Sequence, residues 1–260
     1  MGSEHLQARA VGDGVGHLIF DHPSRLNALS FGMVAALPQA IHELECNPDV
    51  RVVVLSGAGE QAFISGIDLS SVQESSAENG ETELDFLYQE ALASIRSSLK
   101  PTIAMVSGFC IGAGVAVALA SDIRVCDEKS EFSIPAAKIG IGYADVQPLL
   151  DLVGPGWTSE ILFTGRRLSS EEALSARLVN QVVAAGQLET AVRDLAISIA
   201  DNAPLSIVTA KTAIREARKD AGQRDSDLVS DLVARCRESA DFAEGTRAFL
   251  EKRRPQFTGT

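Results

Sequence analysis

The sequence predicts an α/β fold, in which strands and helices alternate along the chain. Residues 50–55 and 101–106 are apolar and rich in β-branched side chains, which is typical of buried parallel strands. Residues 113–121 are apolar and alanine-rich, which indicates a buried helix after the second strand region. The chain has 260 residues and 45% hydrophobic content, enough for one large core. We expect a core over residues 1–200 and a helical region over residues 201–260.

Turn chemistry and helical spacing predict the N-terminal elements. The glycine-rich turn at residues 12–14 separates the β-like runs 7–11 and 15–20, so it predicts a β-hairpin. Residues 31–44 carry apolar side chains at helical spacing, after an opening at Asn27-Ala28-Leu29-Ser30. Pro38 must kink this helix or reset its start.

The middle of the chain repeats the alternation of strand and helix. Residues 122–126 read as a further strand. Residues 70–81 are polar and lack periodicity, so we expect a mobile loop there. Residues 82–99 return to a helical pattern. This loop and helix would shape the pocket for a substrate tail.

Capping signals define the later helices. Ser169 and Glu172 match a capping box, with the serine at the N-cap and the glutamate at the third helical position. Beyond residue 188 the sequence is almost entirely helix-forming. Pro204 stands at a plausible helix start, and Gly222 and Gly245 are expected helix breaks.

Composition limits the classes of partner. A formal net charge of −12 disfavours nucleic-acid binding through a general basic surface. No apolar run approaches the roughly 18 residues that span a bilayer, so we expect no membrane insertion. The polar start of the chain is unlike a signal peptide, and a cytoplasmic protein is the expectation. Eleven of the 23 Lys and Arg residues lie within 211–254, either as a local cationic patch or as a solvated helix face.

Several catalytic classes find no support in the motifs. The four histidines all precede residue 43 and no G-x-S-x-G occurs, which disfavours a serine-hydrolase triad. The cysteines form no C-x-x-C pair, so we expect reduced core thiols and no metal site. Cys110 falls within a glycine motif, where packing is favoured over nucleophilic chemistry. Gly112-Ala113-Gly114 is an incomplete dinucleotide fingerprint, which leaves NAD binding as an alternative.

Two glycine motifs, residues 62–69 and 107–114, each follow a predicted strand. Backbone amides at a glycine turn and at a helix start can bind a carbonyl oxygen that gains negative charge. The candidate donors are the N–H groups of Ile67 and Ala113, and Gly66 and Gly112 would leave room for the substrate. The alternative is that these glycines only permit close packing of helix and strand.

These motifs resemble the enoyl-CoA hydratase/isomerase (crotonase) superfamily. The resemblance is carried by residues 62–69, 107–122 and 163–183, with support from His22-Pro23, Asn27-Ala28-Leu29 and the closing residues 251–255. It implies a spiral of ββα units and a C-terminal helical region that assembles trimers or dimers of trimers. It also implies an acyl-CoA or enoyl-CoA thioester as the ligand and no tightly bound cofactor. Ile67 and Ala113 match the oxyanion-hole positions of the family.

The same resemblance implies where coenzyme A binds. The turn around Arg25 and a basic C-terminal residue, Lys252 of a neighbouring subunit, would hold the nucleotide end, with Arg25 as the phosphate ligand. A solvated surface arginine is the alternative for Arg25. The full set of expected coenzyme contacts is Arg25, Ala28, Ser65, Gly66, Ile67, Asp68, Leu69, Gly112 and Lys252.

The acid–base residues depart from the family pattern. The two glutamates of the hydratases correspond to Ala116 and Ala136, and a methyl group cannot move a proton. Residues 140–146 resemble a dienoyl-CoA isomerase segment, in which Asp145 would supply the catalytic carboxylate. The other two carboxylates of that subgroup correspond to Ala116 and Ala137. The alternative role for Asp145 is an N-cap on the following helix.

These observations lead to three functional hypotheses. The first is an enzyme that uses Asp145 for isomerisation or another enolate reaction beside the Ile67 and Ala113 amides, with Tyr143 as a secondary proton donor or a packing residue. The second is a non-catalytic acyl-CoA binding protein, motivated by the paired alanines. The third is an NAD-type nucleotide-binding protein.

Overall fold

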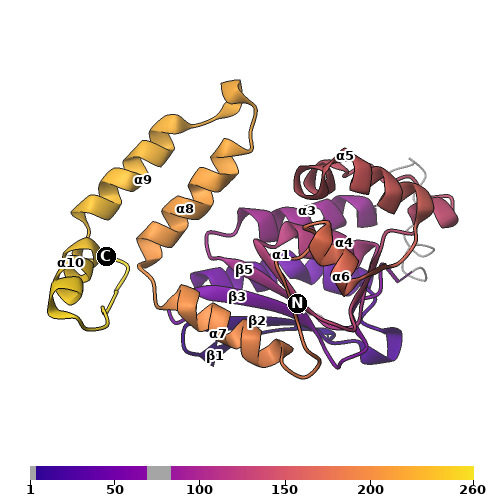
Figure 1. Cartoon of the computed structure of the whole chain (residues 1–260), viewed down its shortest axis with the longest axis horizontal. Coiled ribbons are helices and arrows are strands. Elements are labelled where there is room, and N and C mark those ends of the chain that lie inside the picture. Colours follow the sequence, from indigo (N-terminus) through magenta and orange to yellow (C-terminus); the bar gives the residue numbers. More distant parts are fainter. Residues whose placement is uncertain (1–3, 69–82) are drawn as a thin grey trace.

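The computed structural model describes residues 4–68 and 83–260, and its elements are arranged around two sheets (Figure 1). The loop predicted over residues 70–81 and the expected coenzyme contact Leu69 lie outside the described residues.

The larger sheet has the strand order β1-β2-β3-β5-β7-β10 within the described part of the chain. β1 and β2 form the expected antiparallel hairpin, and every later pairing in this sheet is parallel. The strands are β1 (Leu6–Gly12), β2 (Val15–Phe20), β3 (Val52–Gly57), β5 (Thr102–Val106), β7 (Ile123–Asp127) and β10 (Gln181–Val183). The buried parallel strands predicted from the apolar runs are therefore confirmed.

A smaller sheet has the order β4-β6-β8-β9, namely β4 (Ala62–Ile64), β6 (Phe109–Ile111), β8 (Glu131–Ser133) and β9 (Leu168–Ser169). Along the chain, β3, β5 and β7 of the larger sheet are each followed by a strand of the smaller sheet and then by a helix. This repeated ββα unit is the crotonase-like spiral expected from the resemblance.

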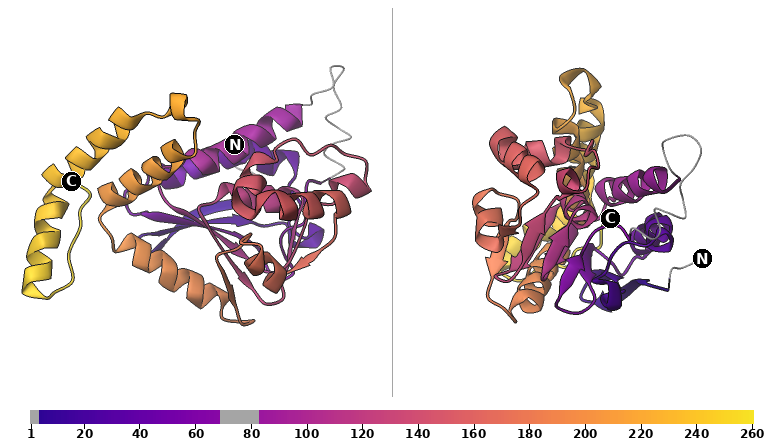
Figure 2. Two further views of the ribbon diagram at one scale, coloured as in Figure 1. Left: turned by 45° about the horizontal axis from the view of Figure 1, so that its top comes forward. Right: turned by 90° about the vertical axis from the view of Figure 1, so that its right-hand side faces the viewer.

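Both faces of the larger sheet are covered. Val53 and Leu55 of β3 pack into the main hydrophobic core, whereas Val52 and Val54 pack into a second cluster that includes residues of α7 (Leu188–Ala200). Alternate side chains of one strand are thus buried on opposite faces, which explains its nearly continuous apolar sequence. Figure 2 shows the helices on the two sides of the sheets.

The helices α1, α3 and α4 contribute many of the buried side chains of the main core. α1 (Phe31–Cys46) begins at an N-cap in which Ser30 accepts a hydrogen bond from Met33 N–H. Pro38 lies inside this single helix, so it does not reset the helix start. α3 (Glu83–Ser97) confirms the helix predicted over residues 82–99. α4 (Ala113–Ala120) is buried along nearly its whole length, as its alanine-rich sequence predicts.

The next helices follow their capping signals. α5 (Gln147–Thr164) contains a break at Gly154, where φ is 74° and ψ is 173°. α6 (Ser170–Ser175) has the predicted capping box, with both the Ser169 and the Glu172 hydrogen bonds formed. The sequence signal was sufficient here because every interaction lies within four residues.

The C-terminal helices form an arm that extends away from the sheets in two views (Figures 1 and 2). It comprises α8 (Pro204–Ala217), α9 (Ser226–Glu238) and α10 (Ala240–Glu251). α8 begins at Pro204, as predicted. The prediction of a break at Gly245 is wrong, because Gly245 lies inside α10. A Cβ there would lie 3.4 Å from the Phe257 ring, so this glycine allows the returning C-terminal segment to approach the helix.

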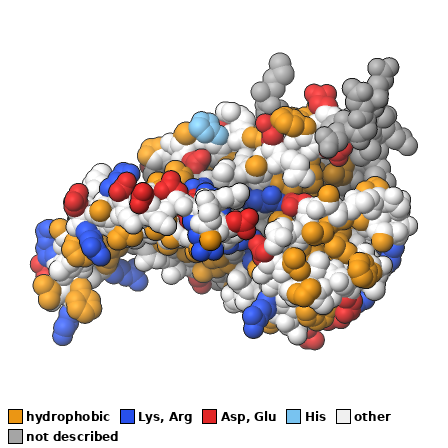
Figure 3. Space-filling view, turned by 90° about the horizontal axis from the view of Figure 1, so that it is seen from above, with side chains coloured by type: hydrophobic (Ala, Val, Ile, Leu, Met, Phe, Trp, Pro, Cys, Tyr) orange, Lys and Arg blue, Asp and Glu red, His pale blue; other side chains and the backbone are white. Residues whose placement is uncertain are grey.

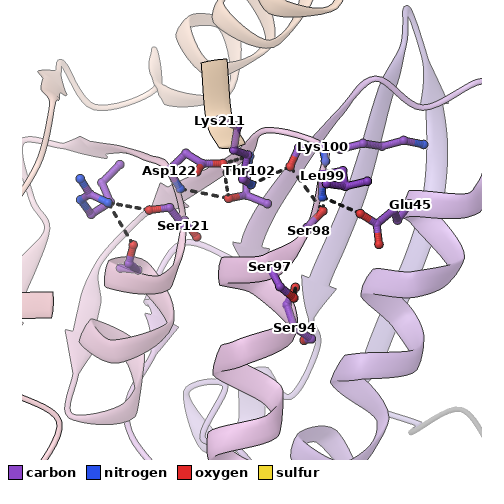
Figure 4. A network of polar contacts seen from close by, with 12 residues as sticks. Glu45, Ser94, Ser97, Ser98, Leu99, Lys100, Thr102, Ser121, Asp122 and Lys211 are labelled. Atoms are coloured by element: carbon purple, nitrogen blue, oxygen red, sulfur yellow. Dashed lines mark hydrogen bonds and ion pairs between the residues drawn. The ribbon is translucent and has the colours of Figure 1, made fainter. Parts of the chain in front are cut away.

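A polar network attaches the arm to the larger sheet (Figure 4). Lys211 Nζ of α8 lies 2.6 Å from Asp122 Oδ2 and donates to the Lys100 carbonyl. The same Asp122 oxygen accepts hydrogen bonds from the backbone and side chain of Thr102 at the start of β5. One carboxylate therefore links α8 to the junction between β5 and β7. Figure 3 shows hydrophobic side chains exposed along the arm and at its far end.

In the part of the chain that the structure describes, no helix combines the length and apolar character needed to span a bilayer.

Candidate active site

The two glycine motifs predicted to form one site lie beside each other. A Cβ placed on Gly112 would lie 4.0 Å from the Cα of Gly66, and one placed on Gly66 would lie 3.8 Å from the Ile111 carbonyl oxygen. Residues 62–64 and 109–111 are neighbouring strands, β4 and β6, so the smaller sheet brings the two turns together. The structure therefore unites segments that are separated by about 45 residues of sequence.

The Ile67 N–H points away from Leu29, the residue that pairs with Ile67 in an isolated parallel bridge. Leu29 N–H donates to the Gly66 carbonyl at 2.8 Å, and Asp68 N–H donates to the Leu29 carbonyl at 2.9 Å. The C=O and N–H of one trans peptide point in opposite directions. Because the Gly66 carbonyl faces Leu29, the N–H of the same peptide, that of Ile67, faces the other side.

The Ala113 N–H has a corresponding geometry. Gly112 is the N-cap of α4, and its carbonyl accepts from Ala116 N–H at 3.3 Å, so the peptide's N–H points outward from the helix start. Within residues 4–68 and 83–260, neither the Ile67 nor the Ala113 N–H donates to another protein group. The partial positive charge at the start of α4 adds to the attraction for an anionic oxygen.

Residues around Arg25 border the first glycine motif. The short helical turn η1 (Pro23–Arg25) brings the Arg25 carbonyl within 3.3 Å of Ser65 Oγ, which donates to it. Ser65 N–H donates to Leu26, and Ala28 N–H donates to Arg25. The side chain of Arg25 is exposed to solvent. Five of the predicted coenzyme contacts therefore lie in one continuous patch: Arg25, Ala28, Ser65, Gly66 and Asp68.

Lys252, another predicted coenzyme contact, lies far from the Arg25 patch of its own chain. It caps the C-terminal end of α10 with a left-handed backbone, φ 55°. α10 lies at the far end of the arm, away from α4 (Figure 1). A second subunit is required if Lys252 is to approach the patch.

Asp145 forms an ion pair that the sequence did not reveal. Its Oδ2 lies 2.6 Å from Nη2 of Arg96, which belongs to the last turn of α3. The alternative role as a helix cap is wrong, because the N-cap of α5 is Val146 and no side chain caps that helix. No local pattern links residues 96 and 145. Only the packing of α3 near the start of α5 brings them together.

Two tyrosines lie near this ion pair. Burial raises the pKa of Tyr143 to about 12, with a further contribution from the charge of Asp145. Burial also raises the pKa of Tyr88, above its usual range, with smaller contributions from Tyr143 and Asp145. Both phenols are therefore protonated at neutral pH. Tyr88 was not singled out from the sequence, although its helical spacing to Leu84, Ala91 and Leu92 placed it near the core face of α3.

The two positions that the resemblance assigns to the hydratase glutamates, Ala116 and Ala136, lie among apolar side chains. Ala116 is buried on α4, one turn after Ala113, and Ala136 begins η2 (Ala136–Lys138). Both pack in the main core cluster together with Ile67 and Tyr143. Cys110 is fully buried, and burial raises the pKa of its thiol well above the usual value, which supports a packing role.

Comparisons with known proteins identify the family. The family model described as enoyl-CoA hydratase/isomerase matches residues 10–260. The chain belongs to the enoyl-CoA hydratase/isomerase family. A short-chain-enoyl-CoA hydratase of Clostridium acetobutylicum is 31% identical and covers 90% of each chain. A peroxisomal Delta(3,5)-Delta(2,4)-dienoyl-CoA isomerase of Arabidopsis thaliana is 35% identical over 93% of this chain and 91% of the relative.

A solved structure supports the same assignment. An enoyl-CoA hydratase/isomerase family protein from Hyphomonas neptunium superposes with a TM-score of 0.92 at 33% identity, covering 98% of both chains. The crotonase fold and the superfamily predicted from the motifs are thus confirmed. The relatives include both a hydratase and an isomerase, so family membership leaves the reaction to be argued from the site.

Proposed function

We propose that this protein binds an acyl-CoA or enoyl-CoA thioester and catalyses an isomerase-type or other enolate reaction. The observation that carries the proposal is the pair of backbone donors. Ile67 and Ala113 have outward-pointing N–H groups on two adjoining turns, where a Cβ placed on Gly112 would lie 4.0 Å from the Gly66 Cα. Fixed donors of this kind stabilise the negative charge that a thioester oxygen gains in an enolate. Gly66 and Gly112 leave the approach to these donors open.

In the proposed reaction, Asp145 is the group that moves the proton. Its carboxylate takes a proton from the carbon next to the thioester, and the electron pair of that C–H bond moves into an enolate whose oxygen is bound by the two N–H groups. The protonated Asp145 then returns the proton to a different carbon of the chain. The double bond shifts, no atom is gained or lost, and no metal or redox step is needed.

Hydration by two glutamates is not the proposed reaction, because alanines occupy both positions. General acid–base assistance is commonly worth about 100- to 10,000-fold in rate, and a methyl group supplies none of it. The presence of a dienoyl-CoA isomerase among the relatives is consistent with this choice.

For the coenzyme, we propose contacts from the patch of Arg25, Ala28, Ser65 and Asp68, with Arg25 donating to phosphate. Leu69 follows directly in sequence and belongs to the same proposed set. Lys252 would come from a neighbouring subunit, which makes a homotrimer or a dimer of trimers part of the proposal.

A thioester panel tests the proposed function. Saturated, enoyl, dienoyl and 3-hydroxyacyl thioesters are assayed for binding and for conversion, with the wild type beside Asp145→Asn. The variant keeps the shape of the residue but cannot accept the proton, so we expect unchanged affinity and loss of turnover. Equal turnover of the two proteins would refute the role of Asp145.

The oxyanion donors have a separate readout. A thioester labelled with ¹³C at its carbonyl should show a lower carbonyl stretching frequency when bound to the wild type, since two donors polarise the bond. An unshifted band in the bound complex would refute the assignment of Ile67 and Ala113. Tight binding with a shifted band but no conversion of any thioester favours the second candidate, a non-catalytic acyl-CoA binding protein, which the two alanines motivate.

A further inference from the structure

Asp145 lies in a segment with little backbone support. Residues 141–146 form neither helix nor strand, and Gly140 before them has φ +74° with open space around its α-carbon. Among the residues that the structure describes, Val146 N–H donates only to the Ala144 carbonyl, two residues earlier. The position of the Asp145 carboxylate therefore depends on what its side chain contacts.

In the described part of the chain, that carboxylate has one polar partner, Arg96. Arg96 projects from a firmly packed helix, because Leu92 and Ile95 of α3 are almost completely buried. Its Nη2 donates to Oδ2 of Asp145, whereas its Nε is buried and has no hydrogen-bond partner among residues 4–68 and 83–260. A solvated surface arginine would keep that N–H in water, so the side chain gives up hydration in order to reach Asp145.

We propose that Arg96 is the positioning residue for Asp145: it holds one carboxylate oxygen and leaves the other for the substrate proton. This inference rests on the proposed function, in which Asp145 moves that proton. A guanidinium on a rigid helix fixes the direction of a carboxylate better than a mobile loop can. Arg96 itself takes no proton and touches no reacting atom.

The chain offers a matched control in a second ion pair. Arg218, the C-cap residue of α8, lies 2.8 Å from Asp151, in the first part of α5 before the break at Gly154. In both ion pairs an arginine at the end of another helix contacts an aspartate within residues 145–151. All four side chains are partly exposed. Arg218→Met therefore removes a comparable contact without touching Asp145.

The test compares Arg96→Met, Arg96→Lys, Arg218→Met and Asp145→Asn in the full chain. For each protein, kcat and KM are measured with the best thioester of the panel, together with the exchange of its α-hydrogen for deuterium in D₂O. Misplacing a catalytic group by about 1 Å can cost roughly 100-fold in rate. We expect Arg96→Met to lower kcat and exchange by about that factor, with KM and the thermal midpoint little changed.

The lysine variant keeps the charge but not the fork of donors, so we expect partial recovery. Arg218→Met should stay within about 2-fold of the wild type, and Arg96→Met combined with Asp145→Asn should be no slower than Asp145→Asn alone. Suppose that Asp145→Asn is inactive. The role of Arg96 is then overturned, and the proposed function stands, if Arg96→Met keeps wild-type rates or if Arg218→Met loses as much kcat as Arg96→Met. Wild-type rates in Asp145→Asn would overturn the proposed function and this inference with it.

Discussion

Gly66 and Gly112 adopt backbone conformations that other residues reach only at a cost. Their φ values are +127° and +54°, and no atom of the described residues lies closer than 3.8 Å to a Cβ at either position. Glycine is therefore required at positions 66 and 112 because of the backbone dihedral, and not because a side chain would clash. A side chain would add strain of roughly 1–3 kcal/mol and would also fill the space that the proposed thioester oxygen needs.

The titration of one residue, His17, makes the stability of the fold depend on pH. It lies on β2, with Nε2 2.8 Å from Ser56 Oγ of β3. Burial lowers its pKa below the ordinary value of 6.5, and the charge of Arg9 contributes in the same direction. The unfolded chain therefore binds more protons than the folded chain as the pH falls. This contribution to stability is complete above 6.5 and is lost as the pH falls below it.

We expect the free energy of unfolding of the wild type to decrease between about pH 7 and pH 5, and His17→Gln to decrease less. The glutamine amide can still bond to Ser56 but does not titrate. Urea unfolding at several pH values measures this, with His42→Gln as the control because His42 is exposed. The same pH slope in His17→Gln and in the wild type would contradict the assignment.

At the scale of elements, the approach of α4 to β4 sets the spacing of the candidate active site. A Cβ on Gly114 would lie 2.3 Å from the Ile64 carbonyl oxygen, a distance that no real contact allows. Either α4 or β4 must therefore move if position 114 carries a side chain. Because Ala113 begins α4 and Ile67 follows β4 by three residues, such a shift separates the two proposed donors.

We expect Gly114→Ala to lower stability by about 1–3 kcal/mol, the usual cost of overpacking a core, and to weaken thioester binding. Gly156→Ala is the control, because Gly156 lies in α5 just after the break at Gly154 and no atom of the described residues is within 4 Å of its Cβ position. Alanine is more favourable than glycine in a helix by up to roughly 1 kcal/mol, so this control should keep or raise the melting temperature. Equal melting curves for the two variants would contradict the clash.

Local signals predicted those elements whose interactions lie close in sequence. The capping box at Ser169, the hairpin at residues 12–14 and the proline start of α8 each depend on a few neighbouring residues. The glycine motifs also predicted their own turns. Periodicity and turn chemistry were therefore sufficient for most of the order of strands and helices.

Long-range contacts account for what the sequence did not reveal. Arg96 reaches Asp145 across 49 positions, and Asp145 forms that ion pair and not the helix cap that was its alternative role. Gly245 resembled a helix break, but its lack of a side chain serves the approach of Phe257. In each case the partner lies outside the helix concerned, so the local helical pattern does not contain it.

At the scale of the whole molecule, the arm exposes an unusual amount of apolar surface. Phe249 of α10 is 83% exposed, and Leu250 and Phe242 are also exposed. α8, α9 and α10 line a largely apolar groove of about 690 Å³. A chain that leaves such a surface in water favours its burial against another copy. The distance of Lys252 from the Arg25 patch within one chain agrees with the proposed trimer.

We expect the 27.5 kDa wild-type chain to have the mass of a trimer or hexamer in light scattering, and Phe249→Glu to shift it toward monomer. A carboxylate at the centre of an apolar contact must be desolvated without a partner, which costs far more than the lost phenyl contact alone. Phe163→Glu is the control, because Phe163 is 78% exposed but belongs to α5.

If Lys252 of a neighbouring subunit holds the nucleotide end of coenzyme A, Phe249→Glu also weakens thioester binding. Lys252→Met then weakens thioester binding without changing the mass of the assembly. A wild type that is monomeric at all concentrations, or dissociation by Phe163→Glu in place of Phe249→Glu, would contradict assembly through the arm.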